Sequence, residues 1–372
     1  MSQPSPQTTD HLRGRLHAEP VGARGIEHYA RNPTCERLGV LVAAQIKPET
    51  AVREVYGRDF DKTPSPFAIL VGNRFENYYF EQGAARLLAL YQQEGLLTVD
   101  EFKVVHVTRR VKGRGETVNE RRKAFTRRLL DLKRSGDPRA PHLIIKPRLE
   151  IDVNGVQYTI EPDYLVAATG DPFYRPGEMK SYPDRAGKTD PSDIRNACRQ
   201  CAVGLVGLRQ ELRRLGAAHA ATIIAPGCDL VLRVPGSFQA TLRPMTIRGE
   251  VASIERITAQ MSALINQVLQ SLSPAATLDD PAVLDRIPHR YCEACKDHCA
   301  LAQVCKEQAI SAGDPVLLGN AAREDLLAAG SLPRALDLMH GRVQPGTPEE
   351  AALQDRLQTA FQAYRQVANY GP

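Results

Sequence analysis

The sequence has few of the features that place a chain in a membrane or mark it for secretion. None of its apolar runs approaches the roughly 18 residues that a membrane-spanning helix requires. The segment MSQPSPQTTDHLRGR holds no apolar stretch of the kind found in a secretory signal. Internal repeats and low-complexity tracts are also missing. We therefore expect a cytoplasmic protein that does not involve a membrane.

Net charge is small as well. The 372 residues carry a formal net charge of +5 at pH 7, which by itself does not identify a polyanionic partner. Hydrophobic residues make up 42% and charged residues 24%, the usual mixture of a globular protein. The length suits one sizeable core with an accessory part. We expect residues 1–22 to be a flexible leader, residues 23–310 the core, and residues 311–372 a helical appendage.

The basic residues are unevenly distributed. The segment from Arg109 to Arg139 contains twelve Lys or Arg and four Asp or Glu. Thr117 and Glu120 have the spacing of a capping box and predict the start of a helix, and Gly136 predicts its end. One face of this helix is a candidate for contacts with the phosphates of a nucleic acid, although a solvated charged face explains the pattern equally well. The candidate residues on this helix are Arg121, Arg122, Arg127 and Arg128.

Periodicity and turn residues predict a mixed order of helices and strands. Asn154-Gly155 indicates a hairpin, and Asp190 with Pro191 indicates the start of a helix that ends at Gly216. The predicted helices cover 26–44, with a break near Cys35, and 72–93, 191–215 and 249–272, followed by short helices at 321–329, 332–339 and 348–367. The predicted strands cover 142–151, 156–160, 164–168, 173–181, 221–224, 229–234 and 239–242. This order predicts an α/β (mixed α+β) fold with a central mixed sheet flanked by helices.

Two acids and a lysine form the main candidate site. Pro162-Asp163 opens one predicted strand, and Glu178-Met179-Lys180 lies on the next. Side chains two apart on a strand share a face, so Glu178 and Lys180 should point the same way with Asp163 opposite them. A divalent cation held by Asp163, Glu178 and the carbonyl of Met179 would offset the cost of partly burying these charges. The alternative is an ordinary surface ion pair between one of the acids and a lysine.

Two further polar residues extend this candidate site. The helix that begins near Gly72 offers Glu76 as an upstream carboxylate, with Glu81 as the fallback. A first-turn acid that stabilises the helix dipole is an equally good explanation of Glu76. Gln200 lies on a helix face with small residues and is a candidate for holding a strand end or a phosphate; a solvated glutamine is the alternative.

Cysteines are crowded near the end of the predicted core. Four of the eight fall within fourteen residues, at spacings of two, three and five intervening residues: Cys292, Cys295, Cys299 and Cys305. In a cytoplasmic chain such crowding favours metal ligation over disulfides. Thiolates suit either an iron–sulphur cluster or Zn²⁺, and spacing alone does not decide between them.

These motifs together resemble the iron–sulphur RecB-like nucleases of the PD-(D/E)XK superfamily, which include the CRISPR-associated exonucleases and the AddB nuclease domain. The resemblance implies a restriction-endonuclease-like core with catalytic Asp163, Glu178, Lys180 and Gln200, and with Mg²⁺ or Mn²⁺ bound near Glu76. In that family one cysteine precedes the core and three follow it, so Cys35 resembles the first ligand of a 4Fe-4S cluster. The remaining places go to Cys295, Cys299 and Cys305, with Cys292 as an alternate ligand. The family often has a histidine where this chain has Glu76, and a tyrosine where it has Gly204.

The resemblance implies a metal-dependent deoxyribonuclease that acts on DNA ends or single strands, in recombination and repair, CRISPR-linked or anti-phage work. No ATPase motif is visible, so a helicase or another defence-complex subunit would be a separate partner. The alternatives are a non-catalytic nucleic-acid-binding or assembly subunit that keeps the fold, and a zinc-stabilised restriction-like endonuclease. RNA is an alternative substrate.

Overall fold

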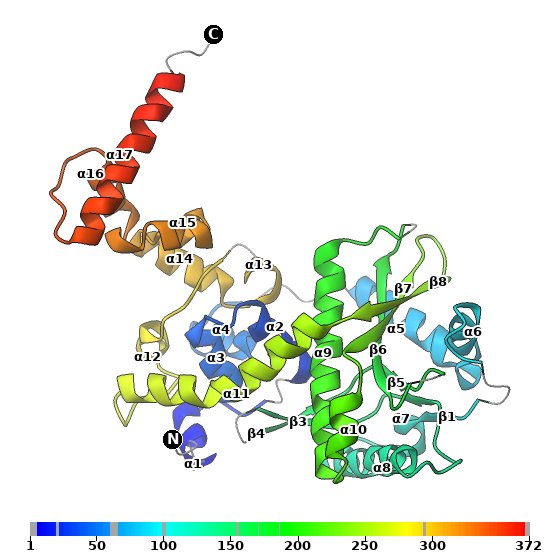
Figure 1. The fold of residues 1–372 in the computed structure, drawn as a ribbon. Coiled ribbons are helices and arrows are strands. Elements are labelled where there is room, and N and C mark those ends of the chain that lie inside the picture. Colours follow the sequence, from blue (N-terminus) through cyan, green and yellow to red (C-terminus); the bar gives the residue numbers. More distant parts are fainter. Residues whose placement is uncertain are drawn as a thin grey trace.

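The centre of the molecule is a six-stranded mixed sheet with the strand order β1-β2-β5-β6-β7-β8 (Figure 1). The structure is a computed structural model that describes residues 6–19, 22–59, 66–98, 102–153, 156–169, 171–185, 187–292 and 295–368. β1 pairs with β2 and β6 with β7 in parallel, and the other neighbours are antiparallel. The strands of this sheet are β1 (Val104–His106), β2 (Leu143–Ile145), β5 (Tyr164–Val166), β6 (Arg175–Pro183), β7 (Gly227–Arg233) and β8 (Ala240–Thr246). A separate hairpin pairs β3 (Leu149–Val153) with β4 (Val156–Ile160).

Both faces of the sheet are covered by helices, and apolar side chains from its strands contribute to a cluster on each face. Leu143 and Ile145 of β2 join the cluster formed with α5 (Pro66–Phe80) and α6 (Ala85–Gln93). Ile144 joins the larger cluster on the opposite face, which includes residues of α9 (Pro191–Arg214) and α11 (Arg248–Ser271). The protein is therefore a mixed α/β fold with helices on both sides of its sheet.

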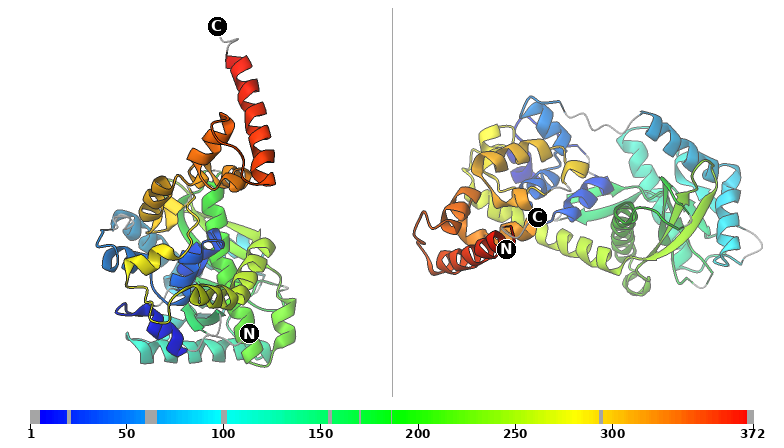
Figure 2. Two further views of the ribbon diagram at one scale, coloured as in Figure 1. Left: turned by 90° about the vertical axis from the view of Figure 1, so that its left-hand side faces the viewer. Right: turned by 90° about the horizontal axis from the view of Figure 1, so that it is seen from above.

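A group of helices lies beside the sheet and brings the two ends of the core together (Figures 1 and 2). Of the early helices, α2 packs against α9 and α11, and α3 packs against α11. Helices α12–α14 return to the same place from the other end of the chain. The early helices are α1 (Pro6–Arg13), α2 (Gly22–Arg31), α3 (Glu36–Ala43) and α4 (Pro48–Glu54). The returning helices are α12 (Pro281–Arg286), α13 (Cys295–His298) and α14 (Ala302–Ala312). On the sheet side, α7 (Val107–Arg110) and α8 (Glu116–Arg134) adjoin β1 and β3, and α10 (Ala218–Ile223) packs on α9.

The C-terminal helices project away from the sheet (Figure 1). They have a small apolar cluster of their own, formed by Ala329, Ala335, Leu338 and Leu353. The helices are α15 (Asn320–Asp325), α16 (Leu332–Met339) and α17 (Pro348–Ala368). Among the described residues, no helix combines the length and apolar character needed to cross a membrane.

Several predicted elements differ from the structure. The helix predicted over 72–93 begins earlier, at Pro66, and is interrupted after Phe80, because Gln82, Gly83 and Ala84 all adopt positive φ. The strand predicted over 142–151 is broken after Ile145, so that β2 and β3 belong to different sheets. Residues 221–224 fall largely within helix α10 instead of a strand.

Helix starts were predicted with mixed success. Asp190 caps α9 as expected, since its side chain accepts a hydrogen bond from the backbone N–H of Ser192 at 2.7 Å. Thr117 is not a cap: α8 begins one residue earlier, at Glu116, and Gly115 precedes it without a side-chain cap. The hairpin residues Asn154 and Gly155 lie outside the described residues.

The N-terminal segment contributes more to the core than expected. Leu12 and Leu16 are buried in the larger apolar cluster. The carbonyl of Leu12 accepts a hydrogen bond from the backbone N–H of Leu278 at 2.8 Å. The prediction that residues 1–22 form a loose leader is therefore wrong for this stretch, where two leucines pack against the end of the core.

Candidate functional site

The charged residues predicted from β5 and β6 converge at one end of the sheet. Asp163 directly precedes β5, and the antiparallel register pairs Tyr164 with Gly177, which directly precedes Glu178. Met179 belongs to the apolar cluster under α5 and α6, so its neighbours Glu178 and Lys180 point to the other face. The period of a strand therefore places Glu178 and Lys180 together beside Asp163.

Hydrogen bonds fix these side chains in place. The Lys180 ammonium lies 2.7 Å from Glu178 Oε1 and donates to Oε1 of Gln200 at 2.6 Å. One carboxylate oxygen of Asp163, Oδ2, accepts from the backbone N–H of Met179 at 2.8 Å. Gln200 on α9 therefore contacts the predicted catalytic lysine and is not a solvated glutamine.

Glu76 joins this group from the opposite helix layer. It lies in the last two turns of α5, so the explanation as a first-turn acid is wrong. Its carboxylate is bridged to Asp163 by Lys146, whose Nζ lies 2.7 Å from Glu76 Oε1 and 2.7 Å from Asp163 Oδ1. The alternative carboxylate, Glu81, is exposed beyond the end of α5.

Lys146 was missed by the sequence analysis. It directly follows β2 and adopts a positive φ of 50°, which is rare for a residue with a side chain. Its only sequence signal is a lysine at the end of an apolar strand, directly before a proline, and that signal is too common to be noticed.

The pKa values reflect how closely these charges are packed. The pKa of Glu178 is raised to about 7, chiefly by burial and secondly by the negative charge of Asp163. Burial and the same neighbour also raise the pKa of Glu76. Burial, the largest single influence, lowers the pKa of Lys180, but the charges of Glu178, Tyr182 and Asp163 together outweigh it, so the pKa of that lysine is raised. The site is thus a partly dehydrated cluster in which acids and lysines neutralise one another.

The cluster opens into a cavity with a volume of about 810 Å³. Its lining includes Glu76, Arg148, Asp163, Glu178, Lys180 and Gln200. Carboxylate and carbonyl oxygens are the donors that Mg²⁺ and Mn²⁺ prefer, so the chemistry of this lining fits a divalent cation.

The four candidate arginines of the basic helix α8 divide into two that make internal contacts and two that are exposed. Arg127 forms internal ion pairs with Glu211, at 2.8 Å, and with Glu150. Arg122 donates to the carbonyls of Val111 and Gly113, both at 3.1 Å. Arg121 and Arg128 are exposed. A role in nucleic-acid binding therefore stays a prediction chiefly for these last two.

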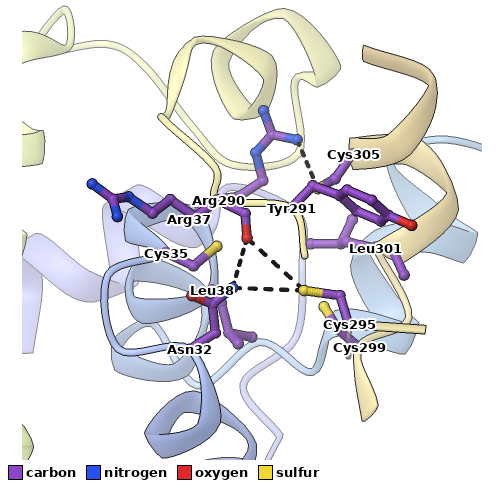
Figure 3. A pocket seen from close by; sticks show the side chains of 11 residues that line it. Asn32, Cys35, Arg37, Leu38, Arg290, Tyr291, Cys295, Cys299, Leu301 and Cys305 are labelled. Atoms are coloured by element: carbon purple, nitrogen blue, oxygen red, sulfur yellow. Dashed lines mark hydrogen bonds between the residues drawn. The ribbon is translucent and has the colours of Figure 1, made fainter. Parts of the chain in front are cut away.

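A second site lies where the two ends of the core meet. Cys35 directly precedes α3, and Cys295, Cys299 and Cys305 come from the segment that carries α13 and α14; together they line one small cavity (Figure 3). Cys292 lies just outside it, with its Sγ 3.4 Å from that of Cys295. The structure thus brings together the same four thiols that the sequence favoured, with Cys292 as a neighbour.

Two side chains around these thiols donate hydrogen bonds to their sulphur atoms. The side-chain amide of Asn32 donates to Cys295 Sγ at 3.6 Å, and the guanidinium of Arg37 donates to Cys305 Sγ at 3.6 Å (Figure 3). Arg37 is only 1% exposed. Burial raises the pKa of Cys305 to about 12, so in the absence of a bound cation this thiol stays protonated. Nearby donors and a positive charge fit a thiolate-bound metal centre.

The cavity between the thiols has a volume of about 10 Å³, close to the space that one water molecule needs. Among the described residues, no three or more His, Cys, Asp or Glu side chains are positioned to hold a metal ion as they stand. A single ion would therefore require small side-chain shifts. A four-iron cluster would require more space than this cavity provides.

Comparisons with known proteins add little. No protein-family model matches the sequence, and no curated protein matches it. A solved structure titled "Crystal structure of SSO0001" matches with 16% identity over 51% of this chain and 96% of that chain, at a TM-score of 0.20. A TM-score this low does not show a shared fold, so the function rests on the geometry of the two sites.

Proposed function

We propose that this protein is a metal-dependent deoxyribonuclease of the PD-(D/E)XK class, with a restriction-endonuclease-like core and a structural 4Fe-4S cluster. The observation that carries the proposal is the convergence of Asp163, Glu178 and Lys180 from β5 and β6 on one open cavity. Glu76 adds a third carboxylate from the opposite layer. Three acids and a lysine at a cavity are groups that can hold a divalent cation and support hydrolysis of a phosphodiester.

Each side chain has a distinct part in this chemistry. Glu76, Asp163, Glu178 and the Met179 carbonyl would hold Mg²⁺ or Mn²⁺, which when bound lowers the pKa of water and polarises a phosphoryl oxygen. Lys180 would orient the attacking water or stabilise the charge that develops on the phosphate. Gln200 would keep the Lys180 ammonium pointing into the cavity through their 2.6 Å hydrogen bond.

The rim of the cavity suits a nucleic acid. Arg148 lines it in an ion pair with Glu161 at 3.0 Å, and the exposed Arg24 lines it from α2. Arginines at the rim would contact phosphates on either side of the scissile bond. The proposed substrates are DNA ends or single strands, with RNA as the alternative, in repair, CRISPR-linked or anti-phage work beside a separate helicase or defence subunit.

The thiol site has a structural part in this proposal. Cys35, Cys295, Cys299 and Cys305 would bind a 4Fe-4S cluster, with Cys292 as an alternate ligand and Zn²⁺ as the alternative occupant. Because Cys35 is at one end of the core and Cys305 at the other, the centre would hold the two ends together.

The decisive experiment is a cleavage assay with Mn²⁺ after anaerobic purification. Labelled single- and double-stranded DNA, with RNA in parallel, are incubated with the parent protein, Asp163→Ala and Lys180→Ala. We expect each variant to lose on the order of 10²- to 10³-fold in rate. The matched control is Lys47→Ala, since Lys47 also pairs with a glutamate, Glu19, at 2.7 Å but lies outside the cavity. Cleavage by Lys180→Ala at the parental rate would rule out the proposal.

One observation favours a non-catalytic nucleic-acid-binding or assembly subunit instead. Lys146 already neutralises Glu76 and Asp163, as expected of a site that no longer binds metal. Binding of labelled DNA by the parent protein, with no cleavage under any divalent metal, would select this alternative.

A further inference from the structure

Lys146 is an internal cation at the centre of the carboxylate cluster. Its ammonium lies 2.7 Å from an oxygen of Glu76 and 2.7 Å from an oxygen of Asp163. The side chain is 17% exposed, so the contacts are largely shielded from solvent. It therefore occupies the place between two carboxylates that a bridging divalent cation would take.

The backbone holds Lys146 in this place against its own preference. Its φ of 50° lies in the left-handed region, which disfavours side chains with a Cβ. The N–H of Lys146 donates to the carbonyl of Asp163 at 2.9 Å, which ties the strained residue to the same segment that its side chain contacts. A residue fixed in an unfavourable conformation beside a candidate site is a candidate for function.

The charges of the cluster show why Lys146 and a metal ion exclude each other. Glu76, Asp163 and Glu178 supply three negative charges when ionised, and Lys146 and Lys180 supply two positive ones. A divalent cation added to this set leaves one unbalanced positive charge in a partly dehydrated site. Release of Lys146 from its two carboxylates restores neutrality, so the cation and the ammonium compete for the same oxygens.

We propose that Lys146 sets the affinity of the site for divalent metal, by holding Glu76 and Asp163 together until the metal displaces it. This inference rests on the proposed nuclease function, because it concerns the same metal site. The neighbouring cavity of about 810 Å³ gives the displaced side chain room to turn away from the carboxylates. Lys146 is thus a positioning residue, and Lys180, held by Glu178 and Gln200, keeps its place.

The test is a calorimetric titration with Mn²⁺ of the parent protein and Lys146→Gln, which keeps much of the side chain but removes the charge. We expect Lys146→Gln to bind Mn²⁺ at least about tenfold more tightly, which corresponds to about 1.4 kcal/mol. Lys123→Gln is the matched control, since Lys123 also bridges two carboxylates, Glu120 and Glu150, but lies on α8 outside the cavity. Asp163→Asn, introduced into the parent or into Lys146→Gln, should abolish Mn²⁺ binding. That loss would show that the Mn²⁺ binds at the carboxylate cluster.

Each outcome has a defined meaning. Tighter Mn²⁺ binding by Lys146→Gln than by the parent supports the inference, including the case in which only the variant binds. Equal or weaker binding by the variant overturns it, and so does binding that Asp163→Asn leaves intact. The cleavage assay is independent: a variant that binds Mn²⁺ more tightly while neither protein cuts DNA supports the role of Lys146 but contradicts the nuclease function.

Discussion

Glu178 and Lys180 show how far local periodicity determines a site. Their two-residue spacing on β6 puts both on the face where Gln200 approaches from α9. The sequence predicted a helix at Gln200 but left the environment of its side chain open. Only the packing of α9 on the sheet decides that this side chain contacts the lysine.

His28 provides a prediction about stability at low pH. Burial, together with the charges of Arg31, His298 and Arg24, lowers the pKa of His28 to about 3. In the unfolded chain the pKa of His28 is about 6.5. The neutral, buried His28 therefore contributes fully to the stability of the fold above that pH, and this contribution is lost as the pH falls toward 3. Between pH 7 and pH 5 we expect the parent to lose about 2 kcal/mol more stability than His28→Gln.

Urea unfolding at both pH values measures this difference. The control is His219→Gln, because His219 is an exposed residue of α10. If the parent and the His28→Gln variant lose the same stability between pH 7 and pH 5, the pKa of His28 is not lowered in the folded protein, and the folded protein takes up that proton at pH 5.

The pairing of β5 with β6 depends on a glycine. A Cβ added to Gly177 would lie 2.0 Å from Cζ of Tyr164, its partner in the register. Tyr164 is fully buried and its hydroxyl lies 3.1 Å from that of Tyr91, so the ring has little freedom to move aside. We expect Gly177→Ala to lower the free energy of unfolding by about 3 kcal/mol and to weaken the proposed cleavage activity, because it separates Asp163 from Glu178.

Gly249→Ala is the matched control for this substitution. Gly249 lies in the first turn of α11, where an added Cβ would meet no atom within 4 Å, so alanine there should be neutral or stabilising by up to about 1 kcal/mol. Similar unfolding curves for the two variants in urea would contradict the steric argument.

The break between α5 and α6 shows the limit of element prediction. The apolar pattern over 72–93 is helical throughout, and nothing in it except Gly83 suggests an interruption. Yet Gln82, Gly83 and Ala84 all have positive φ, and two of them carry side chains. This local cost is offset because both helices can then pack on the same face of the sheet, as Phe75 of α5 and Leu87 of α6 do.

At the scale of the whole molecule, the thiol site connects the ends of the core. We expect Cys35→Ser and Cys305→Ser to lose bound metal and to unfold at a lower temperature than the parent, since a centre between them closes a loop of about 270 residues. Iron, zinc and sulphide content, visible absorbance and thermal unfolding measure the outcome, and the metal analysis separates a cluster from zinc.

Cys198→Ala is the control for metal content. Cys198 is a buried cysteine of α9 and does not line the cavity between the thiols. The Cys198→Ala variant should therefore keep the metal content and absorbance of the parent. Parental metal content in Cys305→Ser would remove Cys305 from the ligand set and leave Cys292 as its replacement.

Hydrogen bonds also connect the two ends of the core, independently of any metal. Arg37 of α3 donates to the carbonyls of Ile287 and Asp285 at 3.2 and 3.1 Å, and to Gln308 Oε1 at 2.8 Å. These bonds join the early helices to α12 and α14. Loss of the proposed metal centre should therefore loosen the core without unfolding it completely.

The sequence by itself determined what depends on neighbouring residues: the mixed α/β class, the start of α9 at Asp190, the hairpin partners β3 and β4, and the shared face of Glu178 and Lys180. These features follow from strand and helix periods and from capping, which act over a few residues. Only the tertiary structure decided that Lys146 lies between Glu76 and Asp163, that Arg127 pairs with buried carboxylates, and that Leu12 belongs to the core. Those contacts join residues distant in the chain, and their energies depend on burial and dielectric surroundings that exist only once the sheet and its helices have packed.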